Sequence, residues 1–180
     1  GKSALVAEAI WTLAPGSDPP ERFPDGIVYY SFYDQPQSAQ ALEFIARAYG
    51  EDPRTGPATA AQRALSNRCA LVVLDGTEST DDLPKILTVK GRGCILIATR
   101  RHKDAPSGWT DILPLPEQDA VALLRAWAGD RARDVTSATR ICNLVGGLPL
   151  AVRLAGRYMA QTGIEDSEYL TWLESSALAA

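Results

Sequence analysis

Two short, uninterrupted apolar runs constrain the fold more than any other feature of this 180-residue sequence. Residues 71–74 (LVVL) close on Asp75, and residues 94–98 (CILIA) are followed by Thr99 and Arg100. Runs of four or five apolar residues bounded by polar or turn residues are typical of strands that are buried on both faces of a parallel sheet. The sequence therefore predicts an α/β protein in which both runs are fully buried strands.

The remaining pattern predicts a parallel sheet flanked by helices and then a small all-α domain. We expect the boundary within residues 113–116, so the predicted domains are 1–114 and 115–180. Apolar spacing and turn residues place further strands at 27–32 and, as a short edge strand, at 112–113; helices are expected at 2–13, 38–49, 58–65, 82–87, 117–128, 135–145, 148–162 and from 166 to about 178.

Composition excludes some functions and favours a soluble, intracellular chain. The formal net charge of -4 argues against a general nucleic-acid surface, although backbone amides and one or two cations can still hold a phosphate. We find neither a membrane-spanning apolar stretch nor a signal-peptide pattern, so a cytoplasmic location is expected. The three cysteines, Cys69, Cys94 and Cys142, are far apart and accompany a single histidine. Zinc is therefore not expected, and the cysteines are interpreted as small buried apolar residues in a reducing compartment.

The chain begins with Gly1-Lys2-Ser3 directly before the first predicted helix. A phosphate-binding loop needs a glycine for close backbone approach, a lysine for the β- and γ-phosphates, and a Ser or Thr hydroxyl for Mg²⁺. The N-terminus of the following helix adds a favourable dipole for anions. Three residues are a weak signal, and a disordered chain end is the alternative interpretation.

Polar residues at the carboxyl ends of the two apolar runs strengthen the first interpretation. Ligands of open α/β sheets bind at the carboxyl ends of the strands, so Asp75 is placed to hold Mg²⁺ through a water, opposite the Ser3 hydroxyl. Arg100 follows the second run, and its planar fork suits phosphate oxygens. The alternatives are an ordinary strand-ending turn for Asp75 and a solvated surface arginine for Arg100.

In this order, the segments resemble the NB-ARC nucleotide-binding module of STAND-class P-loop NTPases, as found in bacterial signalling proteins. The most specific element is residues 142–151, which fit C-x-x-x-G-G-L-P-L-A; taken alone, its Gly-Gly-Leu-Pro is also a good helix start. The other matching segments are the end of the P-loop (1–3), the second strand (27–32), Walker B (71–75), the ILxTTR sensor strand (95–100) and residues 113–124.

The resemblance implies an ASCE-type P-loop core, an ARC1-like helical domain, and an ATP/ADP-dependent signalling switch with slow hydrolysis and Mg²⁺. Gly1, Lys2 and Ser3 would then bind phosphates, Arg100 would sense the γ-phosphate, and Pro149 would contact the adenine base. Partners would include the nucleotide, proteins recruited through effector and sensor domains outside these residues, and a nucleotide-dependent homo-oligomer.

Two departures from the family pattern affect the predicted mechanism. Gly76 replaces the second acid that often follows the Walker B aspartate. Glu78 then becomes the candidate that polarises the attacking water beside Asp75, with a solvated loop acid as the alternative. The front of the P-loop and its strand are also missing. We expect that strand to lie between the strands ending at Asp75 and Arg100, which would leave a gap of unpaired backbone and predicts further chain upstream.

Two other functions remain open from the sequence. Gly76 is compatible with a scaffold that holds a structural ADP and never turns it over. The helical domain after the sheet is shared with AAA+-like ATPases that act on nucleic acid, although the acidic charge and the GGLPLA segment disfavour that function. No motif in the sequence discriminates ATP from GTP.

Overall fold

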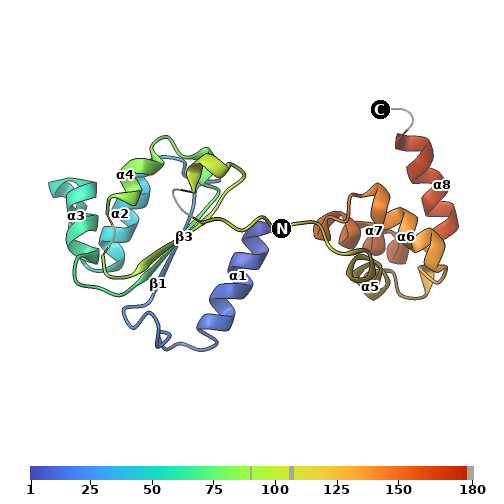
Figure 1. Ribbon diagram of the computed structural model, residues 1–180, viewed down its shortest axis with the longest axis horizontal. Helices are drawn as coiled ribbons and strands as arrows, with labels where there is room; N and C mark the ends of the chain where they lie inside the picture. Colours follow the sequence, from blue (N-terminus) through green and yellow to red (C-terminus); the bar gives the residue numbers. More distant parts are fainter. Residues whose placement is uncertain (90, 106–107, 178–180) are drawn as a thin grey trace. The chain divides into compact units, whose positions relative to one another are not determined.

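The computed structural model describes residues 1–89, 91–105 and 108–177. These residues form two compact units, one of Lys2–Thr110 and one that contains the chain from Asp111 onward (Figure 1). The first is an α/β unit with a small parallel sheet flanked by helices, and the second is all-helical. Among the described residues, no helix is both long and apolar enough to cross a membrane.

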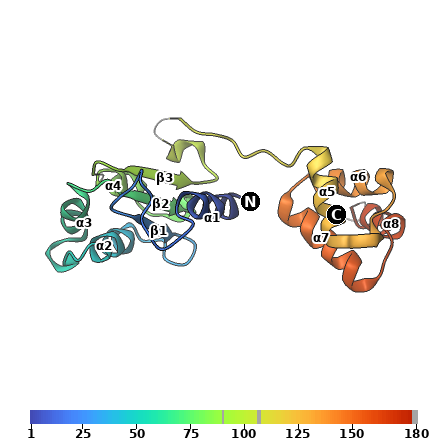
Figure 2. The ribbon, with the colours of Figure 1, turned by 90° about the horizontal axis from the view of Figure 1, so that it is seen from below.

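The sheet of the α/β unit has three parallel strands in the order β1-β2-β3. Helices cover both of its faces, as Figures 1 and 2 both show. The strands are β1 (Ile27–Ser31), β2 (Leu71–Asp75) and β3 (Cys94–Ala98); α1 (Lys2–Leu13) covers one face, and α2 (Ser38–Ala48), α3 (Pro57–Leu65) and α4 (Leu83–Leu87) cover the other.

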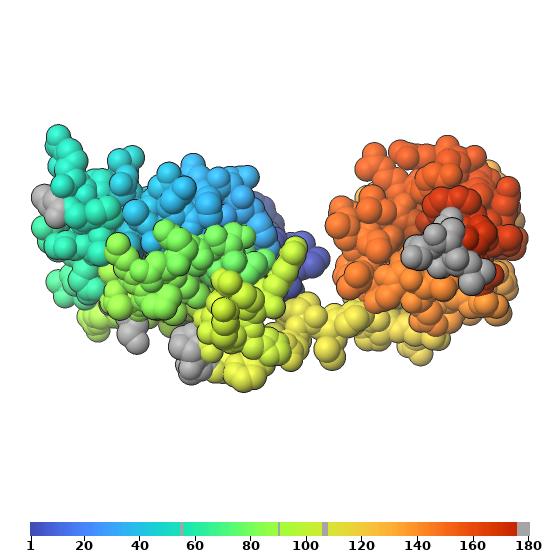
Figure 3. Space-filling view, turned by 90° about the horizontal axis from the view of Figure 1, so that it is seen from above, coloured from blue at the N-terminus to red at the C-terminus, as the bar shows by residue number. Residues whose placement is uncertain are grey.

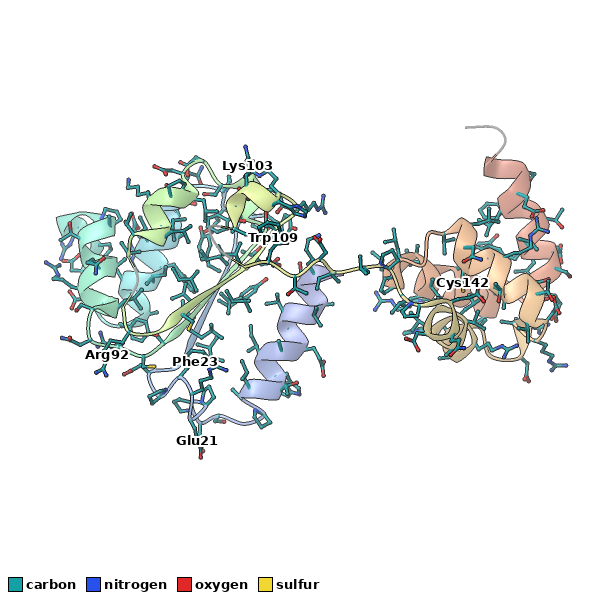
Figure 4. The ribbon with its side chains drawn as sticks, viewed as in Figure 1. Glu21, Phe23, Arg92, Lys103, Trp109 and Cys142 are labelled. Atoms are coloured by element: carbon teal, nitrogen blue, oxygen red, sulfur yellow. The ribbon has the colours of Figure 1, made fainter. Side chains whose placement is uncertain are left out.

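Alternate residues of the strands build a separate core on each face of the sheet. Val72 and Leu74 of β2 pack with the residues of α2, α3 and α4, whereas Leu71 and Val73 pack with Val6 of α1. Phe23, from the segment between α1 and β1, joins the α1-side core (Figure 4). On the other face, α2 and the segment around α4 lie side by side at the surface (Figure 3).

The expected gap between the strands ending at Asp75 and Ala98 is absent, so that prediction is wrong. β2 pairs directly with β3 along its whole length, from Leu71 opposite Cys94 to Asp75 opposite Ala98. The short crossover through α4 delivers the chain to the neighbouring position, as is usual for consecutive parallel strands. No strand lies between β2 and β3, and the backbone groups that face each other are paired.

The expectation that β3 is buried on both faces is also wrong. Ala98 is its only buried residue; Cys94 is exposed, and Leu96 is 38% exposed. Within the described residues β3 is an edge strand, whereas β2 in the middle is buried throughout. The two apolar runs look alike in sequence because burial here depends on the position of a strand in the sheet.

Other local predictions hold to within one or two residues, with two exceptions. Residues 112–113 belong to no strand: Ile112 and Leu113 are exposed in an irregular segment that also contains Pro114 and Pro116, which lack the N–H that a ladder needs. The cysteines differ as well, because only Cys142 is buried. Cys69 is half-buried, Cys94 is exposed, and all three are free thiols.

The helical unit has its own hydrophobic core, in which Cys142 lies among the helices (Figure 4). Two of its helices meet at Gly156, where an added Cβ would lie 2.8 Å from the Leu124 carbonyl oxygen. A glycine is therefore what lets these helices approach. The helices are α5 (Glu117–Ala128), α6 (Val135–Leu144), α7 (Pro149–Thr162) and α8 (Asp166–Ala177).

Candidate functional site

Asp75 ends the central strand and is almost wholly enclosed, with 2% of its surface exposed. Its position in the alternation places it on the α1 face of the sheet, with Leu71 and Val73. The Tyr29 hydroxyl, from the neighbouring strand, donates to Asp75 Oδ2 at 3.1 Å. The other oxygen, Oδ1, is buried and has no hydrogen-bond partner in the described part of the chain.

An unpaired buried carboxylate oxygen costs free energy, because it loses its hydration and gains nothing in exchange. Natural proteins keep such groups where a ligand or water completes them. Mg²⁺ usually binds one or two protein oxygens and keeps several waters, so a single acid is enough for it. The described residues hold no cluster of three His, Cys, Asp or Glu side chains, but Asp75 fits a metal that binds through water.

Gly76 turns the chain sharply at the end of β2. Its φ of 74° lies in the left-handed region, and its N–H donates to the Ala98 carbonyl oxygen at 2.9 Å. A Cβ at this position would lie 2.8 Å from Cζ of Tyr33. Both features favour a glycine directly after Asp75, because a side chain there would adopt a strained backbone and displace the Tyr33 ring.

Glu78 lies in the 3₁₀ turn Thr77–Ser79, and its side chain is only 15% exposed. Oε1 accepts from the Tyr33 hydroxyl at 3.2 Å and lies 3.4 Å from Arg100 Nε. Oε2 accepts from the Arg100 backbone N–H at 3.1 Å and from the Thr99 hydroxyl at 3.4 Å. Glu78 is therefore a tightly engaged acid that ties the turn after β2 to the end of β3, and the solvated-acid alternative does not hold.

The same contacts set the protonation of Glu78. Partial burial alone would raise its pKa, but backbone N–H donors, the Tyr33 hydroxyl and the Arg100 charge together lower the pKa below its ordinary value. Burial and the nearby Glu78 charge raise the pKa of Tyr33, which stays a neutral hydrogen-bond donor. At neutral pH the pair is thus a phenol donating to a carboxylate.

Arg100 follows β3, and its side chain is 72% exposed. Its described contact is the ion pair between its Nε and Glu78 Oε1. The neighbouring Arg101 turns the other way: its Nε donates to Asp104 Oδ2 at 3.2 Å and its Nη2 donates to the Thr77 carbonyl oxygen at 3.0 Å. The two consecutive arginines are therefore distinct. Arg100 presents its guanidinium to solvent, whereas Arg101 braces the turn.

Asp104 is the centre of a buried polar cluster that the sequence analysis missed. Oδ2 accepts from the Thr99 hydroxyl at 2.8 Å and from the Thr77 hydroxyl at 3.2 Å, in addition to Arg101. The cluster locks together the segments that carry Glu78 and Arg100. In the sequence, Thr77 and Thr99 were visible only as polar residues just beyond two strand ends. Asp104 gave no signal, since it lies in the short 3₁₀ turn His102–Asp104.

Lys2 and Ser3 open α1, with Gly1 just before it. The helix runs antiparallel to the strands, so its first residues lie at the same end of the unit as the carboxyl ends of the strands (Figure 1). Asp75 faces α1 at that end. In the described residues, no hydrogen bond or ion pair joins Lys2 or Ser3 to Asp75, and their phosphate-binding roles stay predictions.

Pro149 belongs to the helical unit, where it is the first residue of α7 after the Leu148 N-cap. Gly146 and Gly147 before it have φ values of 68° and 61°, and the Gly147 carbonyl oxygen accepts from the Leu115 N–H at 2.9 Å. This turn joins the start of α7 to the segment that leads into α5. The contact of Pro149 with a nucleotide base stays a prediction.

A groove of about 620 Å³ lies beside α4. None of the seven predicted site residues lines it; its walls include Leu83, Leu87, Arg101 and Lys103. The groove adjoins the cluster around Asp104, because Asp104 and Arg101 both line it, but it does not include Asp75 or Glu78.

No family model matches the chain. The chain is 31% identical over 111 residues to a protein of Hyaloscypha variabilis named "Nucleotide-binding leucine-rich repeat (NLR)-like protein". The match covers 58% of the chain but 11% of that protein. The chain is thus similar to a small part of a much longer protein whose name describes nucleotide binding.

Proposed function

We propose that this chain is the nucleotide-binding part of a signalling switch of the NB-ARC type, which binds ATP or ADP with Mg²⁺. The observation that carries the proposal is the buried, unpartnered Oδ1 of Asp75 at the carboxyl end of the central strand. A folded chain retains such an atom at a cost in stability, which is typical of functional sites. The name of the similar protein supports the same class of function.

The proposed roles follow from the chemistry of each side chain. Lys2 would neutralise the β- and γ-phosphates, with the backbone of Gly1 close to them, and the Ser3 hydroxyl and Asp75 would hold Mg²⁺, Asp75 through a water. Arg100 would bind the γ-phosphate through its exposed guanidinium, and Pro149 would contact the base. Bound Mg²⁺ supplies charge neutralisation for the phosphates.

As a switch, the protein would hydrolyse ATP slowly, with Glu78 polarising the attacking water. The ADP-bound and ATP-bound forms would differ in the exposure of surfaces for protein partners, including further copies of the same protein. The energy for such a change is the difference in affinity of the two nucleotides for the two forms. Arg100 would make that difference, because its partner would be the γ-phosphate.

A second candidate function is a nucleotide-stabilised scaffold without turnover. It is favoured by the engagement of Glu78, whose two oxygens already accept from Tyr33, Thr99 and Arg100. A carboxylate with this many donors is a poor base, because each donor stabilises its charged form. Both candidates require nucleotide binding, and they differ only in hydrolysis.

Calorimetry on the full-length protein tests the binding. We expect Mg²⁺-dependent binding of ATP and ADP, and a loss of about tenfold or more in ATP affinity on Asp75→Asn, since one charged contact to the metal shell contributes about 1.5–3 kcal/mol. Asp18→Asn, at an exposed loop acid, is the matched control and should bind as the wild type does. Absence of binding at millimolar nucleotide would reject the proposal.

Phosphate release separates the two candidates. If Glu78 polarises the water, Glu78→Gln lowers the rate of ATP hydrolysis by about 100-fold, the usual contribution of a general base. An unchanged slow rate removes Glu78 from the chemistry. No release above the background of the Asp75→Asn protein would favour the scaffold.

A further inference from the structure

Tyr33 contacts both residues that distinguish this site from the family pattern. Its hydroxyl donates to Glu78 Oε1 at 3.2 Å, and its ring lies against Gly76, so closely that a Cβ there would be 2.8 Å from Cζ. Tyr33 itself lies two residues beyond β1 and is 49% exposed. A ring this exposed contributes little to the core, yet its hydroxyl is directed at a carboxylate that is mostly enclosed.

Glu78, which accepts from Tyr33, also contacts Arg100. The carboxylate lies 3.4 Å from Arg100 Nε and accepts from the Arg100 backbone N–H. The Arg100 side chain is otherwise exposed, and among the described residues Glu78 is the only acid with which it forms an ion pair. An exposed arginine has many rotamers, so a fixed partner is needed to hold its guanidinium in one direction.

We propose that Tyr33 is a positioning residue, which holds Glu78 and, through Glu78, fixes the guanidinium of Arg100 at the end of β3. The proposal rests on the function proposed above, in which Arg100 meets the γ-phosphate. It extends that function by naming a residue, outside the recognised motifs, that prepares the arginine for the phosphate. Prior orientation lowers the entropy lost when the arginine binds its ligand.

A second tyrosine provides an internal comparison. Tyr29 lies in β1, the strand that precedes Tyr33. Its hydroxyl also donates a hydrogen bond to a carboxylate of the site, but that carboxylate belongs to Asp75. Replacing either tyrosine with phenylalanine removes one hydroxyl and keeps the ring. The two variants therefore differ in which acid loses its donor.

Hydrogen exchange of the Arg100 Nε–H, followed by NMR on the 180-residue chain, tests the proposal without nucleotide. We expect Tyr33→Phe to speed this exchange by about threefold to tenfold, the effect of weakening one hydrogen-bonded arrangement. Tyr29→Phe should change it by less than about twofold by the same estimate. Glu78→Gln, which removes the charge from the partner of Arg100, should speed the exchange at least as much as Tyr33→Phe.

An unchanged Arg100 exchange rate in Tyr33→Phe would overturn the proposal, and so would an equal change in Tyr29→Phe. A purely structural role for Tyr33 predicts broad changes in backbone exchange across β1 and β2 rather than a change at the Arg100 side chain. Backbone exchange recorded on the same samples distinguishes these outcomes.

Nucleotide binding by the full-length protein gives the functional measurement. Tyr33→Phe should lower the ratio of ATP affinity to ADP affinity by about threefold to tenfold, because only ATP presents a γ-phosphate to Arg100. Tyr29→Phe should change both affinities together through Asp75. If the wild type binds no nucleotide, the proposed function fails, whereas the exchange measurement still decides whether Tyr33 positions Arg100.

Discussion

At the scale of single residues, the site is built from acids whose oxygens are unequally satisfied. Glu78 accepts from donors on both of its oxygens, whereas one oxygen of Asp75 has no partner among the described residues. The difference separates a group that holds the protein together from a group that is available to a ligand. Stability measurements can detect it without any nucleotide.

Asp75→Asn should raise the free energy of unfolding of the nucleotide-free chain by about 1 kcal/mol or more, because a neutral amide is less costly to bury than a partly unpaired carboxylate. Chemical denaturation at pH 7 is the measurement. Glu78→Gln is the comparison, and it should lower stability because it weakens several contacts. A destabilised Asp75→Asn protein would mean that this acid serves the fold.

Gly76→Ala should destabilise the α/β unit, since the new methyl group meets the Tyr33 ring and the backbone has a positive φ. Gly50→Ala is a matched control, because Gly50 has a φ of 76° with no atom near its Cβ position. We expect the first variant to lose about 1–3 kcal/mol more than the second, the usual cost of overpacking. Adding Tyr33→Ala to Gly76→Ala should remove most of the difference.

The sequence predicted these residues unevenly. Asp75, Glu78 and Arg100 could be found because strand ends in parallel sheets gather ligand-binding residues. Tyr29 and Tyr33 could not, since an aromatic residue in or after a strand is equally typical of the core, and its partner depends on the register between β1 and β2. That register is set by packing of the whole sheet, beyond any local pattern.

At the scale of secondary-structure elements, the N-terminus of one helix is capped by a residue far away in the sequence. The first helix after β1, α2, has no side-chain cap of its own at Gln37. Asp81, from the segment before α4, accepts from the Ser38 N–H at 2.7 Å and so caps α2 across the fold. This contact fixes the turn after β2 against α2, close to the residues that brace Glu78.

Asp81 should also make stability depend on pH. The backbone N–H of Ser38 and the Ser38 side chain lower the pKa of Asp81. A carboxyl whose pKa is lower in the folded state stabilises the fold above its unfolded pKa, about 3.9, and loses that contribution as the pH falls through the folded value.

Asp81→Ala should therefore lower the melting temperature at pH 7. Below pH 4, the melting temperature of the variant should fall less with decreasing pH than that of the wild type. Thermal melts across this range are the measurement. Asp18→Ala, at an exposed loop position, should melt as the wild type does at every pH. Equal pH dependence in the Asp81→Ala and wild-type proteins would contradict the role given to Asp81.

The elements themselves were largely predictable, because helix spacing and turn residues are local signals. The neighbours of β3 were not predictable from those signals. Its apolar run resembles that of β2, but the two strands occupy an edge and the centre of the described sheet. Sequence alone identifies a strand more readily than its place in a sheet.

At the scale of the whole molecule, each unit has a core of its own. The residues that connect them, 108–116, have no regular structure, and Trp109 and Leu113 are exposed. We expect limited digestion with chymotrypsin to cut first after Trp109, since Pro114 blocks cleavage after Leu113, and to leave two resistant fragments. Each fragment should unfold cooperatively by itself, as separate cores permit. Early cleavage inside α2 or α7 would contradict this division.

Gly156→Ala tests the same independence from inside the helical unit. The added methyl group would lie 2.8 Å from the Leu124 carbonyl oxygen and from Trp127 Cβ, so the contact between α5 and α7 must open. We expect a loss of about 1–3 kcal/mol in that unit. Calorimetric melting should show the change in one transition only, and an equal shift in both transitions would argue against separate units.

The exposed edge of β3 also affects how the protein behaves at high concentration. Its five residues (CILIA) carry no charge and no proline, which are the features that natural sheets use to discourage pairing between molecules. The free thiol of Cys94 lies on the same strand, and dissolved oxygen can oxidise two such thiols to a disulfide that joins two chains once their edges meet. We therefore expect Leu96→Lys with Cys94→Ser to lower both the aggregation and the oxidative cross-linking of the protein at high concentration.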